Sequence, residues 1–186
     1  MYELRHAGAL VLQTIAREIE DDLSQIDFDK HREHIARHLP GGSAVGSKFT
    51  AVQSVGHVID LVIIALPVIF QMVRAGLHVE TMCDAKVSYV KIAIEFEDEI
   101  GTAAVVHRST LPEHVVIGAV LRGPSPEDQH AVFVARSVAP QLTRRLIIDL
   151  RRGTNGRWYL HSAYPGILTP DFTDRAFWAE HVFLEG

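Results

Sequence analysis

The chain lacks the features that mark several common protein classes. Cys83 is its one cysteine, which excludes an intrachain disulfide and a structural zinc site built on several thiolates. No secretory signal pattern follows Met1. The sequence also has no internal repeat and no low-complexity tract. We therefore expect a protein without a signal peptide that acts in a reducing cytoplasm.

Long hydrophobic runs are missing as well. The most apolar stretch, 58–70, contains Asp60 and Pro67 and is shorter than the roughly 20 residues that a membrane helix needs. Its composition is typical of a buried helix, so we expect no membrane insertion. Hydrophobic residues make up 47% of the chain and charged residues 22%, which is enough for one domain with a substantial core.

The chain has few basic residues for a protein that binds nucleic acid over much of its surface. The net charge is −5 with neutral histidines, although a local basic groove remains compatible with this average. Histidine is abundant, with 11 residues. Because the ordinary pKa of histidine is about 6.5, we expect the charge of this protein to change strongly in mild acid.

The first third of the chain has helical periodicity. Apolar residues recur at helical spacing over 4–26, with charged residues between them. A second helix is predicted over 30–39, because Pro40 and the glycines after it cannot continue it. A third helix is predicted over 49–76, bent or divided at Pro67.

From about residue 86 the period changes to that of β-strands. In 86–96 the apolar residues Val90 and Ile92 alternate with polar neighbours, which is typical of a half-buried strand. The pair Asn155-Gly156 is a strong hairpin signal, and the other links are also short, so neighbouring strands should be antiparallel. Further strands are predicted at 102–108, 115–122, 131–138, 143–152 and 157–164.

These patterns predict an α+β fold, in which N-terminal helices pack on an antiparallel β-meander of about five or six strands. We divide the chain into an N-terminal helical segment, 1–28, which is a candidate appendage, and a single domain, 29–186. The tail, 170–186, is too apolar to stay free of the core. We expect it to pack on the sheet as a short helix or strand.

His31, His34 and His38 are spaced three and four residues apart, so a helix would present them on one face. Three interpretations compete. One is acid–base catalysis, because histidine titrates near neutrality. The second is metal binding, since His34 and His38 have chelating spacing, although Arg37 between them disfavours a dication. The third is a solvated helix end without a function.

Lys48 follows a loop of glycine and small residues, 41–47. A lysine in this place could neutralise a phosphate or the charge of a transition state. Ser47 adds a hydroxyl donor beside it. Lys48 as an ordinary surface lysine is the alternative.

The last predicted strand carries His161 and Ser162 and leads to Tyr164. Regular alternation would place His161 and Ser162 on opposite faces, so only one would point into a site unless the strand bends. Tyr164 could donate a hydrogen bond or stack on a base, or it could simply pack in the core. Arg145 and Arg157, with other arginines of the same hairpin, could form a basic surface or a solvated one.

Three short motifs follow one another in a recognisable order. They are His34-Ile35-Ala36-Arg37-His38, Ser47-Lys48-Phe49 and Ser162-Ala163-Tyr164-Pro165-Gly166. From about residue 30 onward, with helices before an antiparallel sheet, this order resembles the toxin ribonucleases grouped with barnase, EndoU, the tRNase colicins and RelE. Many of these are toxin domains of bacterial polymorphic and contact-dependent inhibition systems. The usual threonine of the last motif is Ser162 here.

The resemblance implies an endoribonuclease that needs no metal or other cofactor and cleaves RNA by attack of the ribose 2′-hydroxyl. It implies that His34 or His38 transfers protons and that Lys48 contacts the scissile phosphate. It places Ser162 and Tyr164 at the rim of the same cleft, with His161 as an additional candidate. The implied partners are RNA, with tRNA among the candidates, and a cognate immunity or antitoxin protein.

The implied place of action is the cytoplasm, which includes that of a target cell into which such a toxin is delivered. We assign substrate binding to Arg37, Ser47, Arg145 and Arg157. Two other hypotheses remain open from the sequence. One is a non-catalytic protein-interaction module, and the other is a histidine-ligated metal enzyme.

Overall fold

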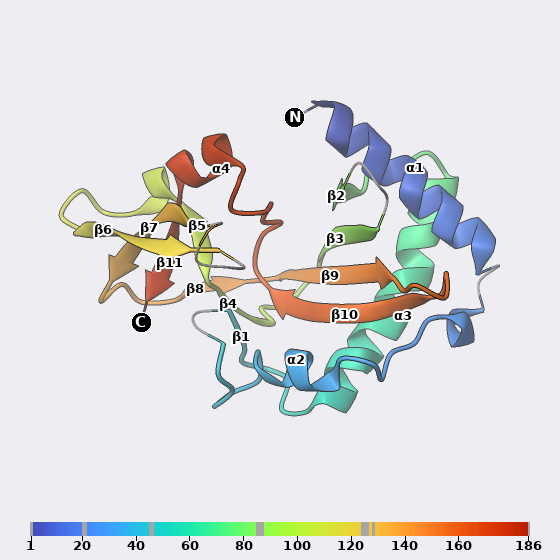
Figure 1. The fold of residues 1–186 in the computed structure, drawn as a ribbon. Coiled ribbons are helices and arrows are strands. Elements are labelled where there is room, and N and C mark those ends of the chain that lie inside the picture. Colours follow the sequence, from blue (N-terminus) through green and yellow to red (C-terminus); the bar gives the residue numbers. More distant parts are fainter. Residues whose placement is uncertain are drawn as a thin grey trace.

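The computed structural model describes residues 2–19, 22–44, 47–84, 88–123, 127 and 129–185, and these form a mixed α+β fold with N-terminal helices and three small sheets (Figure 1). The helices are α1 (Tyr2–Glu18), α2 (Arg32–Ala36), α3 (Val55–Arg74) and α4 (Arg175–Glu180). The strands are β1 (Lys48–Phe49), β2 (Glu80–Cys83), β3 (Tyr89–Glu95), β4 (Gly101–Ala103), β5 (Val105–His107), β6 (Ile117–Arg122), β7 (His130–Arg136), β8 (Gln141–Thr143), β9 (Arg145–Arg152), β10 (Trp158–Pro165) and β11 (His181–Glu185).

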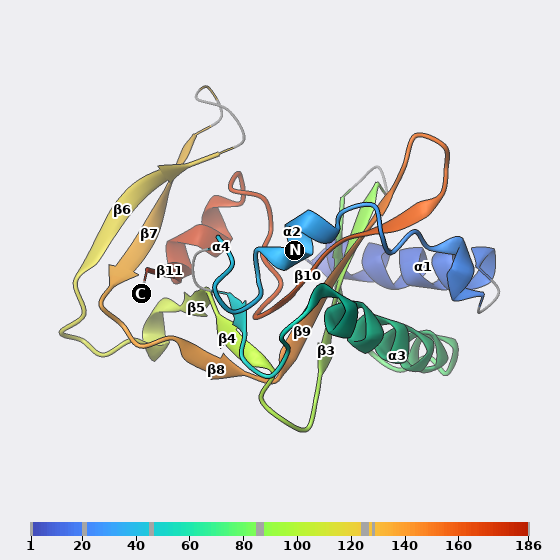
Figure 2. The ribbon, with the colours of Figure 1, turned by 90° about the horizontal axis from the view of Figure 1, so that it is seen from below.

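The largest core lies between α1, α3 and a four-stranded antiparallel sheet with the order β10-β9-β3-β2. Leu146, Ile148 and Leu150 of β9 are fully buried in this core. Val90 and Ile92 of β3 face the same way, which confirms the alternation predicted for this strand. Figure 2 shows α1 and α3 on one side of these strands and α2 on the other. The second face of the sheet lies outside the main core, so it can carry polar residues.

A second four-stranded sheet, with the order β5-β11-β7-β6, forms the other end of the molecule. The C-terminal tail supplies both α4 and β11, so it packs on the protein as a helix followed by a strand. Trp178 of α4 stacks on Phe183 of β11, with ring centroids 5.0 Å apart, and Phe172 lies 5.2 Å from Trp178. A small sheet with the order β1-β4-β8 joins the two ends.

The structure differs from a single antiparallel meander in two ways. The strand predicted at 102–108 breaks at Ala104, and the one at 143–152 breaks at Arg144, with the parts in different sheets. In addition, β11 lies between β5 and β7 and runs parallel to β7. An alternating pattern reports which side chains are buried but not which strands are neighbours, so these features were not predictable from the period.

The helix predicted over 49–76 begins later than expected, at Val55. Ser54 caps it, because its Oγ accepts a hydrogen bond from the backbone N–H of His57 at 3.2 Å. Phe49 instead lies in β1 and is buried. The helix is not divided at Pro67.

Helix α3 is long and apolar enough to span a membrane by length and composition alone. In this fold its inner face is part of the core, where Val58, Val62, Leu66 and Phe70 are fully buried.

The predicted helix over 4–26 is two elements, α1 and a 3-10 turn at Leu23–Gln25. Leu12 and Ile15 of α1 are fully buried in the same hydrophobic cluster as α3 and the sheet. The candidate appendage thus contributes side chains to the core of the protein.

Candidate active site

Helix α2 lies against β10, so the two segments that carry most of the predicted site residues meet on the second face of the sheet (Figure 2). The contact is made largely by aromatic rings. We call these rings the histidine row, and in spatial order its members are Tyr159, His31, His161, His34, His38 and Tyr164. Successive ring centroids are 5.1, 5.0, 4.9, 6.0 and 5.2 Å apart.

A β-bulge in β10 resolves the expected conflict between His161 and Ser162. The register with β9 shifts between Leu160, which pairs with Leu150, and Ser162, which pairs with Asp149. The extra residue is His161, and a bulge lets two consecutive side chains share a face. His161 contacts the rings of α2, and Ser162 lies opposite Asp149 on that same face, away from the main core.

Helix α2 is short, and contacts outside the helix hold it in place. Ile35 is fully buried and anchors its inner face. The backbone N–H of Phe49 in β1 donates to the carbonyl of His38 at 2.8 Å. The Lys48 ammonium donates to the carbonyl of Arg37 at 3.0 Å and also to that of Gly42. The bonds to Arg37 and His38 satisfy carbonyls just past the helix end, where intrahelical partners are lacking, and the bond to Gly42 fixes the loop that follows.

His38 has a defined proton position. Its Nδ1 lies 3.0 Å from the carbonyl oxygen of Ser47, which can only accept, so Nδ1 carries the proton of the neutral ring. The lone pair of Nε2 is then available as a base. Burial lowers the pKa of His38 to about 4, and the hydrogen bond to Ser47 opposes this shift only partly.

The neighbouring histidines are also biased toward the neutral form. Burial lowers the pKa of His161 to about 3, and the positive charge of Arg151 acts in the same direction. Burial, followed by the charge of Arg37, lowers the pKa of His34. The Nδ1 atom of His161 is buried and has no hydrogen-bond partner among the described residues.

Tyr164 closes one end of the row. Its ring stacks on His38 with an interplanar angle of 25°. Burial raises the pKa of its phenol to about 12, so the hydroxyl keeps its proton at any physiological pH. Tyr159 closes the other end, where the ammonium of Lys30 lies 3.8 Å from the ring centroid.

The row therefore brings together four of the residues predicted to be catalytic, namely His34, His38, His161 and Tyr164, and Ser162 shares their face. Lys48 is adjacent in the chain to Ser47, the partner of His38, but its ammonium faces the carbonyls at the end of α2. These bonds use two of its three donors.

The predicted substrate-binding residues are more dispersed. The Oγ of Ser47 is buried and accepts from the backbone N–H of Ala104 at 2.9 Å. Arg145 forms an ion pair with Glu80 at the start of β9. Arg157 is exposed beside the β9–β10 turn, and Arg37 is exposed at the end of α2.

The structure adds Tyr89, Lys91, Asp149 and Arg151 to this face; of these, the sequence had suggested only Arg151, as one arginine of a basic hairpin. The strand register places Tyr89, Arg151 and Tyr159 in one transverse line, and Lys91, Asp149 and Ser162 in the next. Lys91 donates to the carbonyl of Thr169 at 2.7 Å. Asp149 and Arg151 alternate with apolar residues, so the sequence indicates that they share one face of their strand. Their cross-strand neighbours are tens of residues away in the chain, so only the strand order identifies them.

The described residues contain no group of three or more histidine, cysteine, aspartate or glutamate side chains arranged to hold a metal ion. The rings of the histidine row contact one another in tilted and edge-on pairs. The hypothesis of a histidine-ligated metal enzyme thus lacks a ligand set in the part of the chain that is described.

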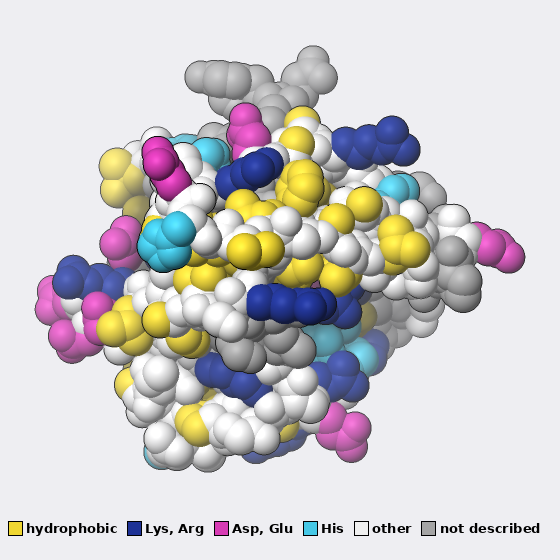
Figure 3. Space-filling view, turned by 90° about the vertical axis from the view of Figure 1, so that its left-hand side faces the viewer, with side chains coloured by type: hydrophobic (Ala, Val, Ile, Leu, Met, Phe, Trp, Pro, Cys, Tyr) yellow, Lys and Arg dark blue, Asp and Glu magenta, His cyan; other side chains and the backbone are white. Residues whose placement is uncertain are grey.

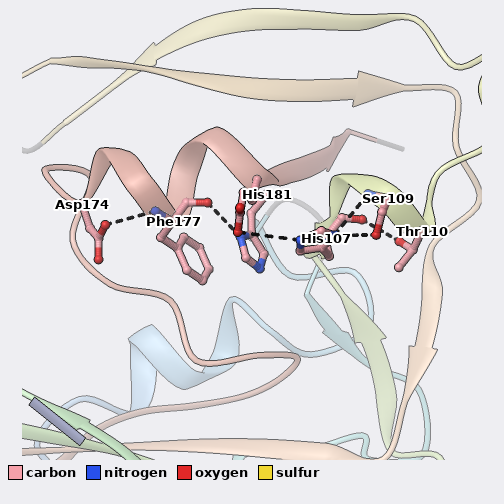
Figure 4. A network of polar contacts seen from close by, with 7 residues as sticks. His107, Ser109, Thr110, Asp174, Phe177 and His181 are labelled. Carbon is pink, nitrogen blue, oxygen red and sulfur yellow. Dashed lines mark hydrogen bonds and ion pairs between the residues drawn. The ribbon is translucent and has the colours of Figure 1, made fainter. Parts of the chain in front are cut away.

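A second pair of histidines lies at the other end of the molecule (Figure 4). His107 and His181 contact edge-on with centroids 5.2 Å apart. The Nδ1 of His107 lies 2.6 Å from the Ser109 hydroxyl, and that of His181 lies 2.8 Å from the carbonyl of Phe177. Each partner is two or four residues away, so these rings stabilise a local turn and the α4–β11 junction.

Comparison with known proteins identifies no family for the chain. Neither a protein-family model nor a curated protein matches it. Among solved structures, it is similar to a conserved hypothetical protein from Toxoplasma gondii ME49, with 9% sequence identity and a TM-score of 0.41. That match covers 74% of this chain and 88% of the other.

Proposed function

We propose that this protein is a metal-independent endoribonuclease of the bacterial toxin class, with the histidine row as its active site. The observation that carries the proposal is the convergence of α2 with β10, which brings the ring of His34 within 4.9 Å of His161 and that of His38 within 5.2 Å of Tyr164, measured between ring centroids. Proton donors and acceptors at this spacing can flank one phosphodiester. Burial lowers the pKa of His38 to about 4, so this ring is neutral near pH 7, as a base must be.

In the proposed reaction, Nε2 of His38 removes the proton of a ribose 2′-hydroxyl. The resulting oxygen attacks the adjacent phosphorus, and the 5′-oxygen leaves with a proton supplied by His34 or by the phenol of Tyr164. The products are a 2′,3′-cyclic phosphate and a 5′-hydroxyl. An anionic phosphate between these imidazoles would raise the pKa of each, which makes one of them a competent acid in the complex.

The partners and place of action belong to the same proposal. RNA, with tRNA among the candidates, would be cleaved in the cytoplasm, including that of a cell into which the protein is delivered. A cognate immunity protein would neutralise it. Support for this context comes from the order of the three motifs, of which the first and the last meet in the row.

The test is cleavage of a labelled single-stranded RNA in the presence of EDTA, with identification of the product ends. Wild-type protein should yield cyclic phosphate ends, and His38→Ala should not cleave. His78→Ala is the matched control, because His78 is exposed and lies outside the row. An oligonucleotide with a deoxyribose at every position should remain intact. Equal cleavage by wild type and His38→Ala would refute the assignment.

A non-catalytic interaction module remains the second candidate, and exposed apolar side chains favour it. Ile64 and Val68, one turn apart on the outer side of α3, are 65% and 48% exposed. At the other end, Val116 and Leu121 are 82% and 63% exposed, and hydrophobic side chains gather in a band across the face seen in Figure 3. This candidate predicts no cleavage of any RNA.

A further inference from the structure

Beneath the histidine row lie two charged residues, Asp149 and Arg151, that none of the sequence motifs includes. Arg151 and Asp149 of β9 point to the same face as Ser162 of β10, because the register pairs Asp149 with Ser162 and Arg151 with Tyr159. His161, the bulged residue, lies between these two pairs in the chain. The arrangement thus gathers groups from β9 and β10 next to the rings contributed by α2.

Arg151 is held in a fixed orientation. Its Nε and Nη2 atoms donate to the two carboxylate oxygens of Asp149 at 3.3 and 3.1 Å. The Asp149 side chain is 4% exposed, whereas that of Arg151 is 40% exposed. A buried carboxylate therefore orients a guanidinium that solvent still reaches. Two of its five donors are used in this pair, and a guanidinium edge matches the geometry of phosphate oxygens.

Two buried polar atoms on this face have no partner among the described residues. They are the Oγ of Ser162, a residue 2% exposed, and the Nδ1 of His161. Leaving a buried hydroxyl or ring nitrogen without a hydrogen bond is unfavourable, so native proteins rarely retain such groups without a reason. A ligand with several acceptor oxygens would satisfy both of them.

Charges of both signs face this place. Arg151, Lys91 and His34 all act on His161. The opposing charges are Asp149, which is engaged by Arg151, and Asp171, which acts on Lys91 from the segment after β10. Two cations, Arg151 and Lys91, therefore lie near two of the three buried polar atoms that have no partner among the described residues, the third being Oγ1 of Thr81 in β2.

We propose that Arg151, His161 and Ser162 form a seat for one phosphate-class oxyanion, with Asp149 as the residue that positions Arg151. The Arg151 side chain is 40% exposed and Ser162 is 2% exposed, so the guanidinium is the group that solvent reaches first. Within the proposed ribonuclease, on which this role rests, the seat holds a phosphate of the RNA beside the histidines. Arg151 then supplies the cationic contact that Lys48, engaged by two carbonyls, was expected to make.

The seat is tested by titrating the protein with inorganic phosphate at low ionic strength, followed by calorimetry. Arg151→Gln should weaken binding at least about tenfold, as expected for loss of a charge-assisted pair. Arg151→Lys keeps the positive charge but loses the paired N–H donors of the guanidinium, so its phosphate affinity should lie between those of wild type and Arg151→Gln. Arg152→Gln is the matched control and should bind as wild type, since Arg152 pairs with Glu18 on the other side of the strand.

Ser162→Ala gives a second readout that does not depend on charge. It should bind phosphate several-fold more weakly and yet melt at a higher temperature than wild type, because an unsatisfied buried hydroxyl is removed. A merely structural serine would not combine these two changes. Far-ultraviolet circular dichroism of each variant checks that the fold is retained.

The proposed phosphate site would be refuted if Arg151→Gln bound phosphate as tightly as wild type, or if Arg152→Gln lost as much affinity as Arg151→Gln. Unchanged phosphate affinity in Ser162→Ala would also refute it. The same titration with an all-deoxyribose oligonucleotide and with a 2′-O-methyl RNA distinguishes free phosphate from a phosphodiester as the natural ligand. Because no cleavage is needed, the two proposals fail separately. Phosphate binding through Arg151 without RNA cleavage would refute only the ribonuclease, and RNA cleavage without Arg151-dependent binding would refute only the seat.

Discussion

Two regions of this protein bring histidines into ring contact, and they differ in what surrounds the rings. At the α4–β11 end, His107 and His181 bond through Nδ1 to groups two and four residues away (Figure 4). In the histidine row, residues from α2 meet a strand more than 120 positions later, and His161 keeps a buried nitrogen without a described partner. Contact between histidines is therefore a poor sign of function, and an unsatisfied polar atom beside fixed cations is a better one.

The largest expected difference between the regions is catalytic. His38→Ala should reduce RNA cleavage by about 10² to 10⁴, the usual contribution of a general base. His181→Ala should cleave within about twofold of wild type, because it lies outside the row. Initial rates with a labelled RNA measure both. Similar losses in the two variants would mean that the regions do not differ in function.

The second difference is the response to acid. For His38 and His161 the folded-state pKa values, about 4 and about 3, lie below the ordinary 6.5, so the unfolded chain binds more protons in mild acid. Stability is complete above about pH 6.5 and falls as the pH drops toward 4. Linkage gives about 2 kcal/mol for each histidine between pH 7 and pH 5. Solvent screening reduces the share of the half-buried His161, so we expect a total loss of about 3 kcal/mol, measured by urea unfolding.

Replacing His38 and His161 with glutamine should flatten this pH dependence. The matched double variant, His107→Gln with His181→Gln, should keep the wild-type slope. If the double variant of His107 and His181 is the one that flattens the pH dependence of stability, the histidine row is not the acid-sensitive region.

The third prediction concerns Lys48. Since its ammonium bonds to the carbonyls of Arg37 and Gly42, Lys48→Met should lower the free energy of unfolding by about 1.5 kcal/mol, a few degrees in melting temperature. Unchanged stability together with weaker binding of a 2′-O-methyl RNA would restore the direct phosphate contact that the sequence suggested.

The smallest expected effects come from two buried serines with opposite surroundings. Ser162→Ala should raise stability by about 1 kcal/mol, because its Oγ has no described partner. Ser47→Ala should lower it by a similar amount, because its Oγ accepts from the backbone of Ala104. Thermal unfolding distinguishes the two signs, and destabilisation by both would mean that Ser162 is satisfied in solution.

Local patterns in the sequence were sufficient for much of the framework. Alternation predicted the buried face of β3, the Asn155-Gly156 pair predicted the β9–β10 hairpin, and the spacing of His34 and His38 predicted their common face. Each of these is a short-range property, set by side-chain periodicity or by the backbone conformation that a turn requires.

The rest depended on contacts between distant segments. The bulge at His161 breaks the two-residue period on which the strand prediction relied, and it brings His161 and Ser162 to one face. The roles of Arg151 and Asp149 follow from their neighbours in β10, which a single sequence does not specify. The parallel β11 likewise required knowledge of where the tail returns.

The most direct test of the histidine row as an RNA site is a histidine-selective nitrogen–proton correlation spectrum of the protein at pH 6, recorded with and without a 2′-O-methyl RNA. We predict neutral rings for His38 and His161 in the free protein and shifts of both signals on addition of the RNA, while the signals of His107 and His181 do not move. Charged row histidines at pH 6, or RNA-dependent shifts confined to His107 and His181, would contradict it.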